Sequence, residues 1–388
     1  MNTRPVLDSD KGPFALSASF NADSSYFSVA LESGFRIFWS KKAEQKVAHE
    51  IGGGIGSVEM LDKTSYFALI GGGKQPKFPQ NKVCLSASAS DSTSWDLLSH
   101  TDMVYEVQIW NDATQRISTS LEFSTPVQRV RLSKTHLVVV LLNRVNIYHM
   151  RIPPAKIADY ETAPNPLGLA DLAASTLAFP GRAPGQIKLL DLATHHVSII
   201  PAHEAPLRAL ALSRDCRTLA SASESGTLVR LWSIPACTKL FELRRGVDPA
   251  IILSLAFSPS GSSVAVTSDK STLHIFDLPA APSPDAPDDH KWKMLAKLPL
   301  LPRQFSDTYS NCSAKFSMGD ATRAGAQQTG IPGVPGGRPT KGLLGWLDES
   351  TVVVLGAGQD ARWEKFVVGF DEAGKRAVWR EAWKRYLD

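Results

Sequence analysis

Residues 210–232 read LALSRDCRTLASASESGTLVRLW, and the same pattern returns 45 residues later, at 255–276, as LAFSPSGSSVAVTSDKSTLHIF. Each copy contains three short apolar runs separated by turns rich in Gly, Ser and Asp, as expected for strands joined by hairpins. The period matches the roughly 40–45 residues of a four-stranded blade in a WD40-type propeller. One blade alone cannot bury its apolar faces, so the repeat predicts a ring of several blades.

Similar closing strands recur elsewhere in the chain, and with the two copies of the repeat they make seven. They lie at residues 34–39, 107–110, 145–148, 185–190 and 366–370. Only the far C-terminus shows a long stretch of helical periodicity. We therefore predict an all-β, seven-bladed WD40-type β-propeller, formed as a single domain over residues 1–388.

Three segments do not fit the blade pattern. Residues 84–106 are a Ser-rich tract that interrupts a predicted strand, and they are either a flexible insertion or a translated intron. Residues 319–342 are rich in Gly and Pro and lack the apolar content to pack, which predicts a disordered loop before the last blade. Residues 279–311 are too long for an ordinary blade loop, and we assign them to the sixth blade.

Composition excludes several classes of protein. Of the 388 residues, 43% are hydrophobic and 21% are charged, which is typical of a globular protein rather than a disordered one. The formal net charge of +4 is too small to attract duplex nucleic acid, so we expect no nucleic-acid partner. The longest apolar run, residues 137–142, is far shorter than a membrane span, so we expect a cytoplasmic protein that meets membranes only peripherally.

The sequence offers neither a metal site nor a catalytic constellation. The four cysteines lie far apart without metal-ligand spacing, and they are Cys84, Cys216, Cys237 and Cys312. The GGGK run at 71–74 lacks the flanking residues of a phosphate-binding loop, and GGGIGS at 52–57 lacks the third glycine of a dinucleotide-binding turn. We predict reduced thiols, no metal, no cofactor and no enzymatic activity.

Two adjacent arginines, Arg244 and Arg245, lie between a predicted strand and the next blade. Successive strand side chains alternate, so each arginine can serve a pocket on its own side. Arginine makes forked contacts to phosphate oxygens, and Ser, Thr and His add short donors, which suits a multiply phosphorylated headgroup. The nearby polar residues are His203, Ser223, Thr227 and Arg230 in one copy of the repeat, and Ser268, Thr272 and His274 in the next. Taken singly, such groups more often bond their own backbone or neighbours.

Several motifs together resemble the PROPPIN family of phosphoinositide-binding β-propellers. They are LRRG at 243–246, ALIGGGKQPKFPQNK at 68–82, FNAD at 20–23, LAFPG at 177–181 and PAHE at 201–204. The LRRG run is most similar to the WIPI and Hsv-like branch. The resemblance implies phosphatidylinositol 3-phosphate and phosphatidylinositol 3,5-bisphosphate as ligands, bound in two edge pockets of blades five and six.

The resemblance also implies which residues form each pocket. The first pocket would contain His203, Ser223, Thr227, Arg230 and Arg244, and the second Arg245, Ser268, Thr272 and His274. This chain departs from the family at Ser271, where the family often has Gly, and Ser271 lies beside Thr272 in the second pocket.

Residues 291–303 of the long sixth-blade loop carry four cations and no acid. Trp292 and Leu295 fall on one helical face, with Met294 and Leu298 beside them, so the segment could insert shallowly into a bilayer interface. The alternative is a strand packed on blade six. The resemblance favours insertion, because the corresponding loop of the family contacts membrane.

We therefore expect a phosphoinositide effector that associates peripherally with vacuolar, endosomal or preautophagosomal membranes and recruits autophagy partners. The family docks partner proteins through blades one to three, which makes Asn21, Asp23 and Lys77 a candidate partner surface. The alternative is a WD40 protein scaffold without lipid specificity, whose arginines would bind an acidic peptide.

Overall fold

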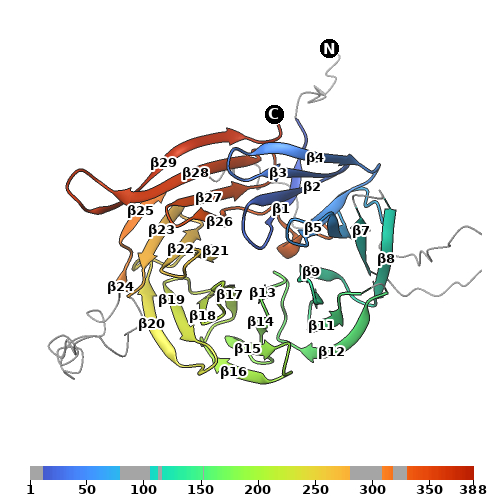
Figure 1. Cartoon of the computed structure of the whole chain (residues 1–388), viewed down its shortest axis with the longest axis horizontal. Coiled ribbons are helices and arrows are strands. Elements are labelled where there is room, and N and C mark those ends of the chain that lie inside the picture. Colours follow the sequence, from blue (N-terminus) through green and yellow to red (C-terminus); the bar gives the residue numbers. More distant parts are fainter. Residues whose placement is uncertain (1–11, 79–104, 112–115, 152, 280–307, 318–329) are drawn as a thin grey trace, which may run out of the picture.

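The protein is an all-β propeller whose sheets stand around a central axis (Figure 1). The computed structural model describes residues 12–78, 105–111, 116–151, 153–279, 308–317 and 330–388. These residues form seven sheets, which we number blade 1 to blade 7 in chain order. The predicted all-β propeller class is confirmed. The predicted insertion at 84–106 lies outside the described residues except for its last two, which begin a strand.

The strands of the first four blades are short and consecutive in the chain. Blade 1 contains β1 (Ala15–Phe20), β2 (Tyr26–Leu31), β3 (Gly34–Trp39) and β4 (Glu44–Glu50), and blade 2 contains β5 (Ile55–Met60), β6 (Tyr66–Gly71), β7 (Tyr105–Asn111) and β8 (Arg116–Phe123). Blade 3 contains β9 (Val127–Leu132), β10 (His136–Leu141), β11 (Arg144–His149) and β12 (Ala155–Glu161), and blade 4 contains β13 (Asp171–Ala173), β14 (Thr176–Pro180), β15 (Gln186–Asp191) and β16 (Val197–Pro201).

The last three blades include two strands that return from the long sixth-blade loop. Blade 5 contains β17 (Leu207–Leu212), β18 (Thr218–Ser223), β19 (Leu228–Ser233), β20 (Lys239–Arg244) and the added β24 (Thr308–Tyr309). Blade 6 contains β21 (Ile252–Phe257), β22 (Ser263–Ser268), β23 (Thr272–Asp277) and β25 (Cys312–Lys315). A 3₁₀ turn, η2 (Pro335–Gly337), precedes blade 7, which contains β26 (Leu343–Asp348), β27 (Thr351–Gly356), β28 (Arg362–Phe370) and β29 (Arg376–Arg385).

The first strand of each blade lies innermost, and these strands form a closed ring. Contacts run from β1 to β5, β9, β13, β17, β21 and β26 in turn, and then back to β1. Each predicted closing strand falls on the third strand of its blade, from β3 in blade 1 to β28 in blade 7. The third strand of each blade is flanked on both edges by other strands, which favours a visible apolar pattern in the sequence.

Blades 1 and 7 meet without exchanging a strand. Ala15 and Gly358 exchange two backbone hydrogen bonds, of 3.1 and 2.8 Å. Tyr386, near the end of the chain, is buried and packs its ring edge-on against Phe27 and Phe38 of blade 1, with centroids 5.3 and 5.4 Å apart. Apolar burial therefore provides most of the contact across this seam.

The helical periodicity of the far C-terminus does not reflect a helix. Residues 376–385 form β29, which pairs with β28 along its length. The register shifts between Lys365 and Phe366, which leaves Glu381 as an extra residue on β29. Residues four apart share a face in a regular strand as they do in a helix, so the spacing of Trp379 and Trp383 does not distinguish the two patterns.

The expected disorder before the last blade is wrong for residues 330–342. This segment packs against blade 2, where Gly73 N donates to Pro332 O at 3.0 Å and Val334 is 5% exposed. A Cβ at Gly72 would lie 2.5 Å from Pro332 O, so the close approach requires glycine. The Gly and Pro content that suggested disorder instead allows tight backbone packing. The rest of that predicted loop lies outside the described residues.

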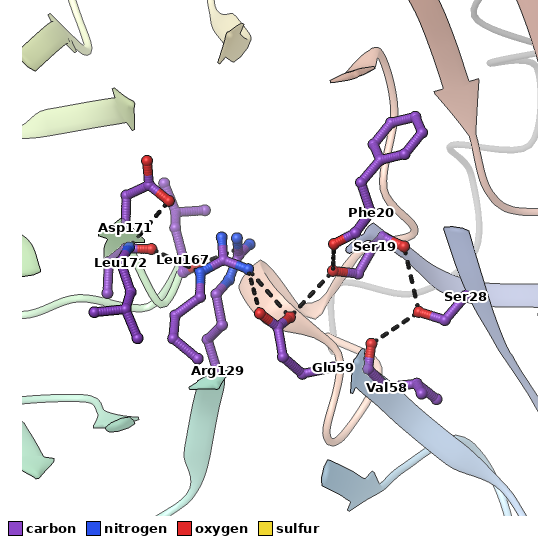
Figure 2. Close-up of polar contacts among 11 residues, drawn as sticks. Ser19, Phe20, Ser28, Val58, Glu59, Arg129, Leu167, Asp171 and Leu172 are labelled. Atoms are coloured by element: carbon purple, nitrogen blue, oxygen red, sulfur yellow. Dashed lines mark hydrogen bonds and ion pairs between the residues drawn. The ribbon is translucent and has the colours of Figure 1, made fainter. Parts of the chain in front are cut away.

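Side chains from the inner strands form a polar network that crosses several blades (Figure 2). Arg131 of β9 donates through Nη1 to both carboxylate oxygens of Glu59 on β5, at 3.0 and 3.1 Å, and through Nε to Ala170 O at 3.0 Å. Ser19 of β1 donates to Glu59 at 3.1 Å. Burial lowers the pKa of Arg131, but the charges of Glu59 and Asp171 and the Glu59 hydrogen bond together outweigh it and raise this pKa. Burial, and after it the charge of Arg131, lowers the pKa of Arg129 to about 10. The network links blades 1 to 4.

Candidate functional site

The arginine pair lies where blade 5 meets blade 6. Arg244 is the last residue of β20 and pairs with Leu228 of β19. Arg245 is fixed by a bond from its backbone N to Thr227 O at 3.1 Å, and its Nη2 donates to Asp248 O. Its Nε is buried and has no hydrogen-bond partner among the described residues. The Arg245 guanidinium is thus held in place without all its donors being used.

His203, predicted for the first pocket, belongs to a hydrogen-bonded group inside blade 5. Its Nε2 lies 2.9 Å from Ser221 Oγ, which also accepts a 2.9 Å bond from Trp232 Nε1. Burial, and after it the charge of Arg230, lowers the pKa of His203 to about 4. The imidazole is therefore neutral at pH 7, and it acts as a neutral hydrogen-bonding group rather than as a cation.

The other residues predicted for the first pocket are also partly engaged by neighbours. Arg230 donates to Ala202 O at 2.7 Å and to a Glu242 carboxylate oxygen at 2.9 Å. Ser223 Oγ lies 2.7 Å from Ser225 Oγ rather than beside His203. Ser221 and Glu242 could not be predicted from the sequence, because a serine in a buried strand and a glutamate in the outer strand of a blade carry no signal of a site. The structure therefore brings His203 together with Arg230 but does not join Ser223 to them.

The second predicted pocket is a continuous chain of polar side chains. Ser268 Oγ lies 2.9 Å from Thr272 Oγ1, which lies 3.1 Å from His274 Nε2. His274 Nδ1 in turn lies 3.1 Å from Ser310 Oγ. Burial, and after it the charge of Arg245, lowers the pKa of His274 to about 4. The structure thus joins Ser268, Thr272 and His274 and adds Ser310, whereas Arg245 acts on this group through its charge.

Ser271 occupies a turn that requires left-handed backbone. Its φ is 57°, and Gly226, at the equivalent position of blade 5, has φ 64°. Both residues connect the second and third strands of their blades. The departure noted at Ser271 therefore places a residue with a Cβ in a conformation that favours glycine.

The long sixth-blade loop returns beside the arginine pair. β24 runs parallel to the end of β20, with Thr308 opposite Leu243 and Tyr309 opposite Arg244. β25 then forms the fourth strand of blade 6. The predicted boundary of 279–311 is therefore too long, because Thr308 and Tyr309 form β24 and belong to the sheet of blade 5. The predicted membrane residues lie outside the described residues, and they are Trp292, Met294, Leu295 and Leu298.

The predicted partner surface is corrected at one position. Asn21 is 4% exposed and uses its side chain to bond Ser25, the backbone of Tyr26 and the backbone of Asp62, so it is a structural residue of the turn after β1. Asp23 is in the same turn. Burial raises its pKa, but bonds from Lys63 and Ser25 outweigh this and lower the pKa to about 2.

Lys77, the third residue of the predicted partner surface, is exposed. It lies in the connection after β6, and its backbone N donates to Gly54 O at 3.0 Å. Asp23 lies instead between the first and second strands of blade 1. The structure gives no contact that joins Asp23 to Lys77.

Within the described residues, the structure contains no helix with the length and hydropathy of a membrane span. The same residues include no cluster of three or more His, Cys, Asp or Glu side chains that could hold a metal ion.

Fold and site together define a WD40-type β-propeller with a half-buried arginine pair between two groups of hydroxyl and imidazole side chains. Residues 89–319 match the PROPPIN family model. SVP1-like protein 2 of Emericella nidulans is 50% identical over 338 residues, covering 84% of this chain and 99% of that protein. SVP1-like protein 2 of Neurospora crassa is 38% identical over 450 aligned residues, covering 100% and 99%. The chain belongs to the PROPPIN family.

Solved structures share the fold at low sequence identity. Kluyveromyces lactis Hsv2 has a TM-score of 0.71 and 20% identity, covering 96% of this chain and 99% of that chain. A complex of KlAtg21 with the coiled coil of AgAtg16 has a TM-score of 0.63 and 16% identity, with the same coverage.

Proposed function

We propose that this protein is a non-enzymatic phosphoinositide effector that binds phosphatidylinositol 3-phosphate and phosphatidylinositol 3,5-bisphosphate through two pockets flanking Arg244 and Arg245. The observation that carries this proposal is the second pocket, where Ser268, Thr272 and His274 form one hydrogen-bonded chain beside the charge of Arg245. Neutral hydroxyl and imidazole groups next to a guanidinium with an unused donor suit a phosphate monoester.

Two weak pockets favour a membrane-bound ligand over a free one. Each charge-assisted hydrogen bond contributes only about 1.5–3 kcal/mol. On one bilayer, however, the second lipid binds at a high effective concentration once the first is held. We therefore place the protein peripherally on vacuolar, endosomal or preautophagosomal membranes, where it recruits autophagy partners. The KlAtg21 complex with a coiled coil supports protein recruitment as part of this function, and Asp23 and Lys77 stay candidates for such contacts.

The test is flotation with vesicles that contain each phosphoinositide in turn. Arg244→Ala combined with Arg245→Ala should abolish binding to both 3-phosphorylated lipids, and each single change should weaken it. Arg217→Ala is the matched control, because this arginine of the same blade is 84% exposed and lies in the turn between β17 and β18. Unchanged flotation by a folded double variant would refute the lipid proposal.

A second candidate is a protein scaffold whose arginines bind an acidic peptide. The observation in its favour is that His203 and Ser223 of the first predicted pocket already bond Ser221 and Ser225. This candidate predicts that binding depends on Arg244 and Arg245 but does not depend on the 3-phosphate. Equal flotation with vesicles lacking that phosphate but of the same charge would favour it.

A further inference from the structure

The outer edge of blade 7 is the longest free strand edge in the described part of the propeller. β29 has ten residues and is the last strand of its sheet, so no other described strand pairs with its outer side (Figure 1). Proteins usually protect such an edge with charges or a bulge, because its unpaired peptide groups can bind another chain. β29 has both, with the bulge at Glu381, yet it also exposes Trp379 and Trp383, by 45% and 52%. Exposed tryptophans instead favour binding.

Trp383 is held in one position although half of its surface is exposed. The guanidinium carbon of Arg362 lies 4.5 Å from the centroid of the Trp383 ring. Asp360 fixes this guanidinium by accepting bonds of 3.1 and 3.3 Å, and it also accepts a 2.9 Å bond from Arg385. An ordered ring loses little conformational freedom on binding, and tryptophan is enriched among the side chains that dominate protein interfaces. Trp383 is therefore suited to anchor a partner.

The residues after the bulge present different chemistry on the two faces of the sheet. Trp383 pairs with Glu364 of β28, and Lys384 pairs with the next residue, Trp363. Neighbouring strand residues point to opposite faces. The Trp363 face is the one toward blade 1, because Trp363 Nε1 donates to Ser40 O there at 2.8 Å. An occupant that lies along the edge of β29 therefore contacts the indole on one face and the lysine on the other.

Blade 1 adds further cations at this end of β29. A hydrogen bond from Lys46, and after it the charge of Lys46, lowers the pKa of Glu44, and the charges of Lys42 and Lys384 lower it further. Lys384 thus lies close to the start of β4. Glu44 pairs with Lys46 at 2.7 Å, whereas Lys42 and Lys384 form no ion pair within the described residues. These two cations remain available to the acids of a partner.

The acids near this end of β29 do not cancel its positive charge. Asp388 is exposed, but the exposed Asp371 and Glu372 lie at the other end of β29, in the turn after β28. The remaining acids are already in ion pairs: Asp360 with Arg362 and Arg385, Glu364 with Arg380, Glu381 with Lys365, and Glu44 with Lys46. Opposite charges stabilise a pair of strands, so an acidic occupant fits this edge better than a basic one.

The chemistry of the edge also distinguishes between kinds of occupant. A second copy of β29 would bring cations close to cations, which destabilises a strand pair. A bilayer offers neither donors nor acceptors to the unpaired peptide groups of a strand edge. An extended protein segment offers both, because it can add a strand to the sheet.

We propose that an acidic, extended segment of a partner protein adds a strand to β29 along residues 382–385. One face of the added strand places an apolar side chain against Trp383, and the other places carboxylates beside Lys384 and Lys42. This contact goes beyond the proposed function, and it does not depend on lipid binding at the arginine pair.

The probe is a labelled peptide as long as β29, ten residues, that alternates valine and glutamate. Its apolar and acidic side chains lie on opposite faces when it is extended. Fluorescence anisotropy should show that it binds the unaltered protein about tenfold more tightly than the same peptide with lysine in place of glutamate. Amide hydrogen exchange at residues 382–385 should slow when it is bound. The acidic peptide with alternate backbone nitrogens methylated cannot complete the ladder and should not bind.

Trp383→Ala should weaken binding of the acidic peptide by about ten- to hundredfold. Phe370→Ala is the matched control, because Phe370 is 67% exposed and lies 5.2 Å from the guanidinium carbon of Arg376, but at the far end of β28. It should leave peptide affinity unchanged. Lys384→Glu combined with Lys42→Glu should make the lysine peptide the tighter ligand, which is a gain that misfolding cannot imitate.

Equal affinity for the acidic and basic peptides, or an acidic peptide that binds Trp383→Ala as tightly as the unaltered protein, would overturn the proposal. Unchanged affinity of the methylated peptide would also overturn it, because no strand would then be added. Dimerisation of the protein that Trp383→Ala abolishes would assign the edge to a second copy, and loss of vesicle flotation by that variant, while folded, would assign it to a bilayer. Either result would overturn the proposal. Flotation of the Arg244 and Arg245 variants tests the proposed function separately.

Discussion

Ser271 pays a conformational cost that Gly226 avoids in the equivalent turn of blade 5. We expect Ser271→Gly to raise the free energy of unfolding by about 0.5–1 kcal/mol, because relief of the left-handed conformation outweighs the extra freedom of glycine in the unfolded chain. Urea denaturation measures this change. Ser225→Gly, in the blade 5 turn and without positive φ, is the control and should not stabilise. A loss of stability in Ser271→Gly would contradict the argument.

The two site histidines predict a pH dependence of stability. Folding lowers the pKa of both His203 and His274 to about 4, from about 6.5 in the unfolded chain. Between these pH values the unfolded state binds more protons than the folded state. The contribution of the two histidines to the free energy of unfolding is therefore fully present above pH 6.5 and is lost as the pH is lowered toward 4. His274→Gln should make this fall shallower when urea midpoints at pH 7 and pH 5 are compared. An equally steep fall would show that His274 does not contribute.

The site residues that can be predicted from the sequence are those at or near equivalent positions in the two copies of the repeat. Ser268 and Thr272 can be predicted because they repeat Ser223 and Thr227 at the 45-residue offset, with His274 nearby, and the structure joins all three. Ser310 could not be found, because it reaches His274 only after a long connection has returned to the blade. Asn21 was assigned wrongly, since an asparagine that bonds turn backbone looks the same in sequence as one on a binding surface.

Because the chain returns to the sheets through β24 and β25, the effect of replacing the sixth-blade loop depends on where the replaced segment ends. Replacing residues 280–307 with a Gly/Ser linker should leave folding and headgroup binding intact and weaken vesicle retention. Replacing 279–311 should also weaken headgroup binding, because it removes Ser310 from His274 and β24 from the edge of blade 5. Headgroup titration on both variants tests this difference. Equal headgroup affinity in the two would show that the returning strand does not support the pocket.

Strands differ in how well the sequence predicts them, and burial is the reason. The second and third strands of each blade are paired on both edges, so strands such as β22 and β23 show a clear apolar pattern. The outer strands have one free edge, and β4 and β29 are largely exposed, so their patterns are mixed. β24 is two residues long and is defined only by its partner, which no local pattern can reveal.

The polar network at the centre ties blades together across long distances in sequence. Glu59 and Arg131 are 12% and 19% exposed, so breaking their pair leaves a largely buried charge. We expect Glu59→Gln to lower the free energy of unfolding by about 3 kcal/mol. Glu44→Gln is the matched control, because Glu44 pairs with Lys46 on an exposed strand and should change stability little. If the two changes have equal effects on the free energy of unfolding in chemical denaturation, the Glu59–Arg131 pair does not stabilise the ring.

The ring itself could be predicted because the same short pattern recurs along the chain, and each copy requires neighbours to cover it. The contacts that close the ring could not be predicted from the sequence. No local signal shows that Tyr386 packs on Phe27 and Phe38, since these residues come from opposite ends of the described chain. The same holds for residues 330–342, whose composition suggested disorder until their contacts with Gly73 were known.

The seam between Ala15 and Gly358 also has a consequence for biosynthesis. A ribosome adds residues at about 5–20 per second, so blade 1 emerges roughly 20–70 s before the strand that completes its seam. During that interval the ring is open, and Phe27 and Phe38 have no Tyr386 to cover them. We therefore expect the nascent chain to need shielding by chaperones at blade 1, and to acquire its final stability only when blade 7 has left the exit tunnel.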